Sequence, residues 1–237
     1  MTDKDCSLPC WWGFTLHRDT LQTTKSTLKN LFPDLLVQSN TGEKSTKTFM
    51  VLPTGPDLDS ENGNGVVSFW TRNSDNRLVA VNLSLDYPAD SYVDWSSYMP
   101  TNILTVYGEP EDVTISYPLD GLPRGTSYYL IMSYPQKGIF VSYMMYYATL
   151  EEIIDDSVGI PICNYLLDVS LFKMWIQTED ANADDIGISL DALDSLQPNE
   201  YHLEDISTYD MASFTEAFSE PDTCIYTLPY DEWVRAE

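Results

Sequence analysis

The same order of predicted elements occurs twice in the first 147 residues of the chain. The first helical segment follows a capping box, Asp19-x-x-Gln22, and runs to Phe32. The second begins at Pro100 and ends at Tyr107, before the stop signal Gly-Glu-Pro. Strand-like runs follow both, at 48–52, 66–72 and 78–85 in the first copy and at 113–117, 128–134 and 139–147 in the second.

This recurrence predicts an α+β fold built from two tandem helix-plus-antiparallel-hairpin (α-β-β-β) units. Residue identity between the two copies is weak, so chance recurrence of a common element order is the alternative. The hydrophobic fraction of 43% is sufficient for a buried core.

The last third of the chain differs in charge from the rest. From Ala148 onward there are 21 acidic residues against two basic ones, Lys173 and Arg235. A strand at 169–176 and helices near 189–196 and 211–218 still provide apolar side chains for a core. We therefore expect a first unit with a Cys/Trp-rich N-terminus at 1–88, a second unit at 89–150, and an acidic C-terminal strand/helix extension packed on the second unit at 151–237. The acidic run itself is interpreted as a solvated face.

The net charge of −25 limits the partners of the chain. Binding to nucleic acid or to anionic lipid requires clustered Lys and Arg, so we expect neither. The longest weakly polar run, 138–150, is shorter than the roughly 20 residues that a membrane-spanning helix needs, and it alternates like a strand. We therefore expect no transmembrane segment.

The four cysteines, Cys6, Cys10, Cys163 and Cys224, allow three pairings. Cys6 and Cys10 lie together near the N-terminus and the other two lie in the last third, so we expect disulfides Cys6–Cys10 and Cys163–Cys224. The C-x-x-x-C spacing is not the C-x-x-C of zinc ribbons or redox motifs. A zinc ion held by four thiolates and four reduced, packed cysteines are the alternatives.

The sequence also offers a candidate calcium site. Oxygen donors occupy positions 1, 3, 5 and 12 of an EF-hand-like loop at Asp180, Asn182, Asp184 and Asp191. The match fails at position 6, where Asp185 replaces the required glycine. The alternative is an acidic loop that caps the following helix. The segment 57–61 is a weaker candidate of the same kind.

No residue set points to a reaction class. His17 and His202 are the only histidines, and neither has a metal-ligand spacing, so both are interpreted as ordinary surface or cap residues. The sequence contains no G-x-S-x-G elbow, and a catalytic pair cannot be selected from 37 acidic residues. Trp70 and Tyr143 could stack on a sugar, but their strand spacing favours packing. We expect no catalytic or cofactor-binding residue, and whether the chain is an enzyme stays open, with the balance against it.

Several motifs resemble a group of uncharacterised bacterial secreted or lipoprotein-like proteins with an L-P-C-W-W-G motif. These motifs are Cys6-Ser-Leu-Pro-Cys10-Trp-Trp-Gly13, Asn102-Ile-Leu-Thr-Val-Tyr107-Gly-Glu-Pro110, Tyr134-Pro135-x-x-Gly138-Ile139 and Phe214-x-x-x-Phe218 with Cys224, Pro229 and Trp233. The chain departs from the pattern at 14–16, where a Pro-Gly turn is commoner. The resemblance implies an extracytoplasmic address and disulfides, but no activity. At fold level the element order is similar to SmpA/OmlA-type modules and to the tandem beta-lactamase inhibitor protein, both of which are binding modules.

These observations together predict a non-catalytic, extracytoplasmic binding or interaction protein whose partner is unknown. A signal peptide, with a possible lipid anchor, is expected in the unprocessed precursor. A cytoplasmic location is the alternative address. A carboxylate-based hydrolase and an acidic nucleic-acid mimic that occupies a basic protein are the alternative functions.

Overall fold

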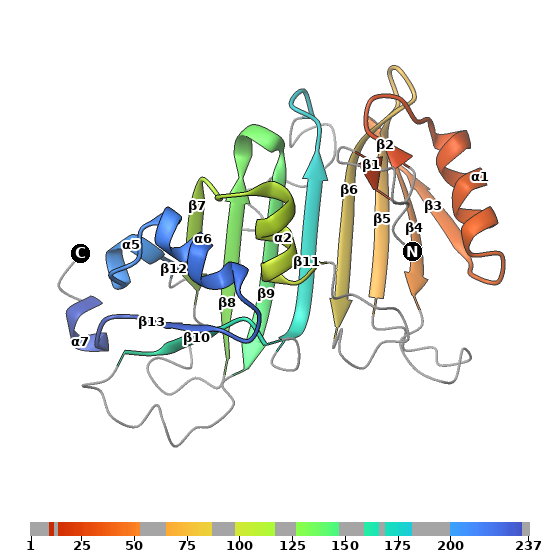
Figure 1. Ribbon diagram of the computed structural model, residues 1–237. Coiled ribbons are helices and arrows are strands. Elements are labelled where there is room, and N and C mark those ends of the chain that lie inside the picture. Colours follow the sequence, from red (N-terminus) through yellow and green to blue (C-terminus); the bar gives the residue numbers. More distant parts are fainter. Residues whose placement is uncertain are drawn as a thin grey trace. The chain divides into compact units, whose positions relative to one another are not determined.

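Nine of the described strands form one antiparallel sheet (Figure 1). The computed structural model describes residues 10–11, 14–52, 65–86, 98–116, 127–146, 159–165, 169–181 and 200–233. The strand order is β12-β7-β8-β9-β11-β6-β5-β4-β3. The strands are β3 (Val37–Thr41), β4 (Ser45–Leu52), β5 (Gly65–Arg72), β6 (Arg77–Asp86), β7 (Asp112–Ser116), β8 (Ser127–Tyr134), β9 (Ile139–Tyr146), β11 (Val169–Gln177) and β12 (Glu200–His202).

The chain divides into two units, and β11 contributes residues to both. Unit 1 consists of Met1–Leu85, Gln136–Ile139 and Lys173–Asp194. Unit 2 consists of Asp86–Pro135, Phe140–Phe172 and Ser195–Glu237.

In unit 1 the strands from β3 to β6 form a meander in which each strand pairs with the next. The register places Met50, Val67 and Leu83 on one face of the sheet, where all three are buried. Phe14, in the short strand β2 (Phe14–Thr15), packs on Phe69 of the same face with 4.6 Å between ring centroids. Strand β1 (Cys10–Trp11) pairs with β2, so the backbone of the N-terminal segment is joined to this core.

Helix α1 (Leu21–Leu31) begins one residue later than a cap at Asp19 would require. Its N-cap is Thr20, whose hydroxyl accepts from the backbone N–H of Thr23, while the Thr23 hydroxyl accepts from the N–H of Thr20. The carboxylate of Asp19 accepts instead from the backbone N–H of Thr15. Leu28, on the inner face of the helix, is fully buried. The amphipathic pattern therefore predicted the helix correctly, but the predicted N-cap is wrong by one residue.

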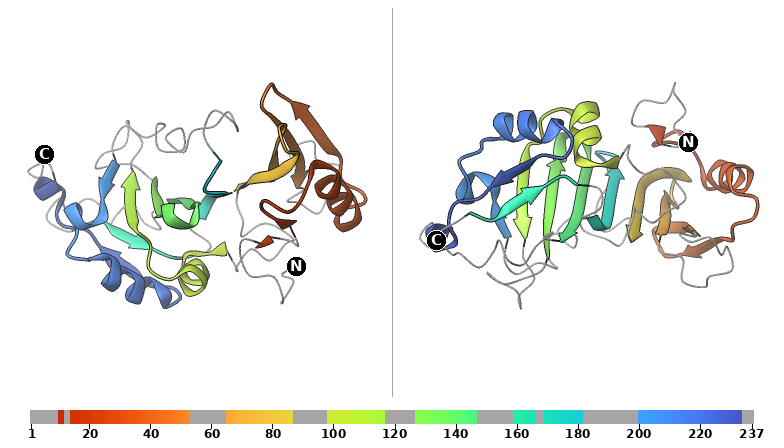
Figure 2. Two further views of the ribbon diagram at one scale, coloured as in Figure 1. Left: turned by 90° about the horizontal axis from the view of Figure 1, so that it is seen from above. Right: turned by 60° about the horizontal axis from the view of Figure 1, so that its bottom comes forward.

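In unit 2 helices cover one face of β7, β8 and β9. Helices α2 (Pro100–Tyr107) and α6 (Met211–Ser219) contact each other, and Figure 2 shows both on the same side of these strands. The layer also contains α5 (Leu203–Ile206), α7 (Tyr230–Trp233) and a two-stranded sheet of β10 (Pro161–Cys163) and β13 (Cys224–Tyr226). Fully buried side chains in this unit include Val113, Ile115, Leu130, Met132, Phe214 and Phe218. No helix in the described part of the chain has the length and apolar character to cross a bilayer.

The predicted fold class of two tandem helix-plus-hairpin units is wrong, because the fold is mostly β and its strands share one large antiparallel sheet. Strand β11, predicted as part of a C-terminal extension, lies between β9 and β6. Strand β3 has no apolar alternation, and no strand is predicted there. A strand's side-chain pattern indicates which faces are buried but not which strand will be its neighbour, since pairing depends on tertiary contacts.

Candidate functional site

Asp180, the first residue of the predicted calcium loop, belongs to an ion-pair cluster at the end of β11. Its Oδ2 accepts from the Arg72 guanidinium at 2.8 Å, and its Oδ1 lies 3.2 Å from Nε2 of His17. The hydrogen bond from Arg72 lowers the pKa of Asp180. A calcium ion at this carboxylate would have to displace the guanidinium. Asn182, Asp184 and Asp191 lie outside the described residues, as does 57–61, so the calcium site stays a prediction.

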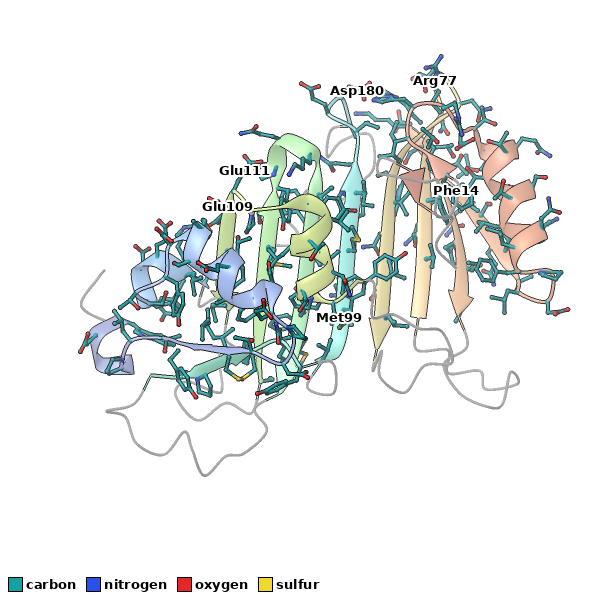
Figure 3. All side chains as sticks on the ribbon, in the orientation of Figure 1. Phe14, Arg77, Met99, Glu109, Glu111 and Asp180 are labelled. Carbon is teal, nitrogen blue, oxygen red and sulfur yellow. A yellow bond between two sulfur atoms is a disulfide. The ribbon has the colours of Figure 1, made fainter. Side chains whose placement is uncertain are left out.

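The same cluster joins three segments of unit 1 that are far apart in sequence. His17 has a left-handed backbone conformation, with φ of 63°, and its N–H donates to Leu78 at 2.8 Å. Its carbonyl oxygen accepts from the Arg77 guanidinium at 3.0 Å. Arg77 and Asp180 are labelled in Figure 3. Each charged group here has a structural partner. The cluster therefore links the segment before α1, the β5–β6 hairpin and the end of β11 by polar contacts.

Of the predicted disulfides, Cys163–Cys224 is confirmed. The two cysteines are register partners in the pair β10–β13, so the bond crosslinks two neighbouring strands. Cys6 lies outside the described residues and only the backbone of Cys10 is described, so the second disulfide stays a prediction.

Next to this disulfide, Asn164 holds the end of α6. Its side chain is buried, with 5% exposure. Its Nδ2 donates to the carbonyl oxygens of Phe218 at 3.1 Å and Glu220 at 2.8 Å, and it lies 3.3 Å from the hydroxyl of Thr101. Its Oδ1 accepts from the N–H of Thr223 at 2.7 Å. One amide therefore supplies partners for backbone groups that the end of the helix leaves unpaired.

Two tyrosines in unit 2 donate hydrogen bonds from inside the core. The hydroxyl of Tyr143 donates to the carbonyl oxygen of Tyr98 at 2.6 Å, and that of Tyr134 donates to Gly108 at 3.0 Å. Burial raises the pKa of both phenols, so they remain protonated donors. Tyr143 also packs on Phe172, with 5.3 Å between centroids. These rings are core residues, in agreement with the packing interpretation, and they offer no surface to a sugar.

Unit 2 carries most of the negative charge of the chain. Its three segments contain 22 acidic residues against 2 basic ones, whereas unit 1 contains 15 and 10. Neither Lys nor Arg occurs among the described residues of unit 2. The helices α5 and α6, their ends and the α2–β7 turn carry exposed carboxylates, which we call the acidic surface: Glu109, Glu111, Glu204, Asp205, Asp210, Glu216, Glu220 and Asp222.

The elements that carry the acidic surface contact one another: α2 contacts α6, and α5 contacts β7. Figure 3 shows Glu109 and Glu111 at the turn between α2 and β7. The carboxylate of Asp210 caps α6 by accepting from the Ser213 hydroxyl at 2.6 Å and from the Ser213 N–H at 2.8 Å. These two bonds, the hydroxyl first, lower the pKa of Asp210. Glu109, Glu204, Glu216, Glu220 and Asp222 are exposed side chains on the same helices and turns.

At the edge of unit 2, His202 pairs with Asp112 across β12 and β7. Nδ1 of the imidazole lies 2.9 Å from Oδ1 of Asp112, and the other carboxylate oxygen accepts from the Thr114 hydroxyl at 3.3 Å. The hydrogen bond to Asp112 raises the pKa of His202, against the opposing effect of burial. His202 also occupies the N-cap position of α5, but its side chain makes no capping hydrogen bond.

Several of these contacts have no signal in the sequence, because the partners lie far apart along the chain. His202 and Asp112 are 90 residues apart, and Arg72 and Asp180 are 108 apart. Within the residues that the structure describes, no group of three or more His, Cys, Asp or Glu side chains could hold a metal ion.

Comparison of the chain with protein-family models, curated proteins and solved structures gave no match. The resemblance of the N-terminal motif to secreted bacterial proteins therefore stays a prediction, and a functional proposal has to rest on geometry and charge.

Proposed function

We propose that this chain is a non-catalytic, extracytoplasmic binding protein and that the acidic surface of unit 2 binds a basic partner protein. The observation that carries the proposal is the separation of charge between the units. Unit 2 combines a net charge of −20 with a described surface that contains no Lys or Arg, whereas unit 1 has a net charge of −5.

Charge of one sign on one unit favours recognition of a partner of the opposite sign. Such a field accelerates encounter with a cationic partner and repels anionic ones, including nucleic acid and anionic membranes. The carboxylates of the acidic surface are exposed to solvent. The exposed side chains of Glu204, Glu216 and Glu220 are therefore available to pair with Lys or Arg of a partner.

The extracytoplasmic address is supported by the disulfide of unit 2. Structural disulfides persist in oxidising compartments and are rare in the reducing cytosol. The proposed address predicts that protein recovered from the exterior of its host contains the Cys163–Cys224 bond. Mass spectrometry after thiol alkylation, with and without reductant, measures this bond directly. Alkylation of both Cys163 and Cys224 in the sample without reductant would show that they are free thiols and would contradict the address.

The absence of a catalytic role is proposed because three groups with shifted pKa values, Asp180, Asp210 and His202, already have structural partners. The lowered pKa of Asp180 follows from Arg72, and that of Asp210 from its helix cap. The raised pKa of His202 follows from Asp112 on an exposed edge. Catalytic sites, in contrast, combine perturbed groups with a pocket in which they converge on one substrate.

Binding to the acidic surface can be tested with two triple variants that change the net charge equally. In unit 2 the variant is E204Q/E216Q/E220Q, and in unit 1 the matched control is D34N/E43Q/E179Q. All six side chains are exposed. The probe is a fluorescent dodecapeptide of alternating lysine and glycine, with affinity measured by anisotropy at several salt concentrations.

We expect the unit 2 variant to bind about tenfold more weakly than wild type, since three exposed ion pairs together contribute about 1–2 kcal/mol. The unit 1 variant should remain within about twofold, and binding should weaken as salt shortens the Debye length. Equal losses in both variants would show that the probe senses only the total charge, which would refute the assignment to unit 2. An acidic partner recovered by cross-linking through unit 2 would refute it as well.

A further inference from the structure

The two edges of the large sheet differ in how they are protected against pairing with another strand. β12, at one end of the strand order, has three residues, two of which are Glu200 and His202. Short length and charge are common means of blocking an edge. β3, at the other end, has five residues, Val-Gln-Ser-Asn-Thr, with no charge and no proline. Its register with β4 is continuous, without a bulge, and four of its five residues are exposed.

The hydrogen-bond pattern shows which backbone groups of β3 point outward. Gly42 donates its N–H to Ser45 at 2.8 Å, directly across the β3–β4 hairpin. Hydrogen-bonded and non-hydrogen-bonded pairs alternate in an antiparallel ladder, so Asn40 and Gln38 also bond to β4. The N–H and C=O groups of Val37, Ser39 and Thr41 then point away from β4, at a spacing of about 7 Å.

We infer that the outer edge of β3 is a docking site for an extended, acidic segment of another protein, which adds as a further strand beside Val37, Ser39 and Thr41. Strand addition to an exposed edge takes its affinity from main-chain hydrogen bonds and its specificity from alternate side chains. This site lies in unit 1 (Figure 1) and is independent of the acidic surface of unit 2.

The charge around β3 is positive, which favours an acidic partner. Helix α1, which contacts β3, contains Lys25 and Lys29 and no acidic residue. The next strand carries Lys47 opposite Asn40. Asp34 precedes β3, and Glu43 and Lys44 lie in the turn that follows it, so the four lysines and two carboxylates leave a net charge of +2 around the strand. At physiological salt the Debye length is about 8 Å, so charges farther away than these contribute little.

A second copy of the chain fits this edge less well than a foreign segment. Antiparallel pairing of two β3 strands would bring the lysines of α1 and β4 against those of the partner copy. It would also join two chains of net charge −25. Both effects oppose association.

An apolar contact at the start of β3 further defines the bound segment. Leu36 precedes the strand and is 72% exposed, and Val51, next to the Val37–Met50 pair, is 42% exposed. An apolar side chain of the docked strand would cover both. The preferred segment therefore alternates acidic residues with apolar ones.

Ser39→Pro tests the docking directly, because it removes an outward N–H that the pairing with β4 does not use. Proline is tolerated in edge strands where its nitrogen faces solvent. Ser39→Ala is the matched control, since it keeps the N–H and loses only the hydroxyl. The probe is a fluorescent heptapeptide of alternating glutamate and valine, compared with one of alternating lysine and valine.

We expect the glutamate peptide to bind wild type and Ser39→Ala equally, and Ser39→Pro at least tenfold more weakly. Amide NMR shifts on binding should be largest at Val37, Ser39 and Thr41, a readout that does not depend on the fold of the proline variant. Equal binding to Ser39→Pro, shifts that map to unit 2, or tighter binding of the lysine peptide would each overturn the proposal. A concentration-dependent dimer in sedimentation that Ser39→Pro abolishes would overturn it in favour of self-association.

Discussion

Replacing Asn164 with aspartate should destabilise unit 2 strongly at neutral pH, although the two side chains have nearly the same shape. A carboxylate in this place can still accept from Thr223, as Oδ1 does now at 2.7 Å. It cannot donate to the carbonyl oxygens of Phe218 and Glu220, which Nδ2 now contacts at 3.1 and 2.8 Å. Leaving a buried acceptor unsatisfied costs about 1–3 kcal/mol, so two of them give about 4 kcal/mol in total. That is a large part of the free energy of unfolding of a small domain.

The penalty of Asn164→Asp should depend on pH. Carbonyl oxygens facing the new carboxyl raise its pKa in the folded state above the unfolded value of about 3.9. Between these two values the folded state binds more protons than the unfolded state, so stability relative to wild type falls as pH rises. The destabilisation should be smallest at and below about pH 4, where a protonated carboxyl can donate to one of the two carbonyls.

Urea denaturation of the disulfide-intact protein, followed by tryptophan fluorescence between pH 4 and pH 7, measures this free energy. Trp233 is buried in unit 2 and reports on its unfolding. Asn164→Ala should cost at least about 4 kcal/mol without the pH dependence, because it leaves the two carbonyl oxygens and the N–H of Thr223 without partners and adds no charge. Asn30→Ala, on the exposed face of α1, should change stability by less than about 0.5 kcal/mol. A loss below about 1 kcal/mol for Asn164→Asp at pH 7, or a loss that is flat with pH, would refute the reasoning.

Three further outcomes are expected. Asp112→Asn should lower the pKa of His202 toward the ordinary value of about 6.5, which NMR titration of the imidazole would measure. In wild type, the His202–Asp112 pair should stabilise the folded state below the pKa of His202 in the unfolded chain, about 6.5. This stabilisation should be lost as the pH rises through the higher pKa of the folded state. Gly159→Ala should destabilise by about 2 kcal/mol or more in thermal unfolding, because its Cβ would overlap the carbonyl oxygen of Thr227. Gly108→Ala has open space around its Cβ and should cost about 1–3 kcal/mol from the backbone alone, because φ of 75° with ψ of −155° is a conformation that essentially only glycine adopts. Replacing both cysteines of the confirmed disulfide with serine should lower the free energy of unfolding by about 4 kcal/mol, from the entropy of a loop that spans 61 positions; a loss below about 1 kcal/mol would contradict this.

Local patterns in the sequence located most of the described strands and helices. The strand-like runs at 66–72 and 128–134 correspond to β5 and β8, which are buried at most positions of both faces, and the helical segment at 211–218 corresponds to α6. These predictions succeed because short apolar runs rich in β-branched and aromatic residues favour strands, and apolar residues four positions apart share one face of a helix. Strand β3 escaped prediction because an exposed edge buries no face and leaves no apolar period.

The candidate site was much less predictable than the elements. The acidic composition of the last third was evident from the sequence and is consistent with the negative charge of unit 2. The hydrogen-bond partners of Asn164 and His202 could not be predicted, since no sequence pattern identifies the partner of a buried amide or an exposed imidazole. Asp180 was chosen for a calcium loop because of its spacing to later oxygens, yet in the fold its carboxylate faces Arg72 from another strand.

The amino-acid sequence alone determined the excess of negative charge toward the C-terminus and predicted the positions of the main elements; the pairing of Cys163 with Cys224 was one of several arrangements that it allowed. Only the tertiary structure decided that the strands form one sheet with β11 between β9 and β6, and that β3 is left at its edge. The physical reason is that side-chain periodicity records how a segment meets the core, whereas strand order is selected by packing between segments many residues apart.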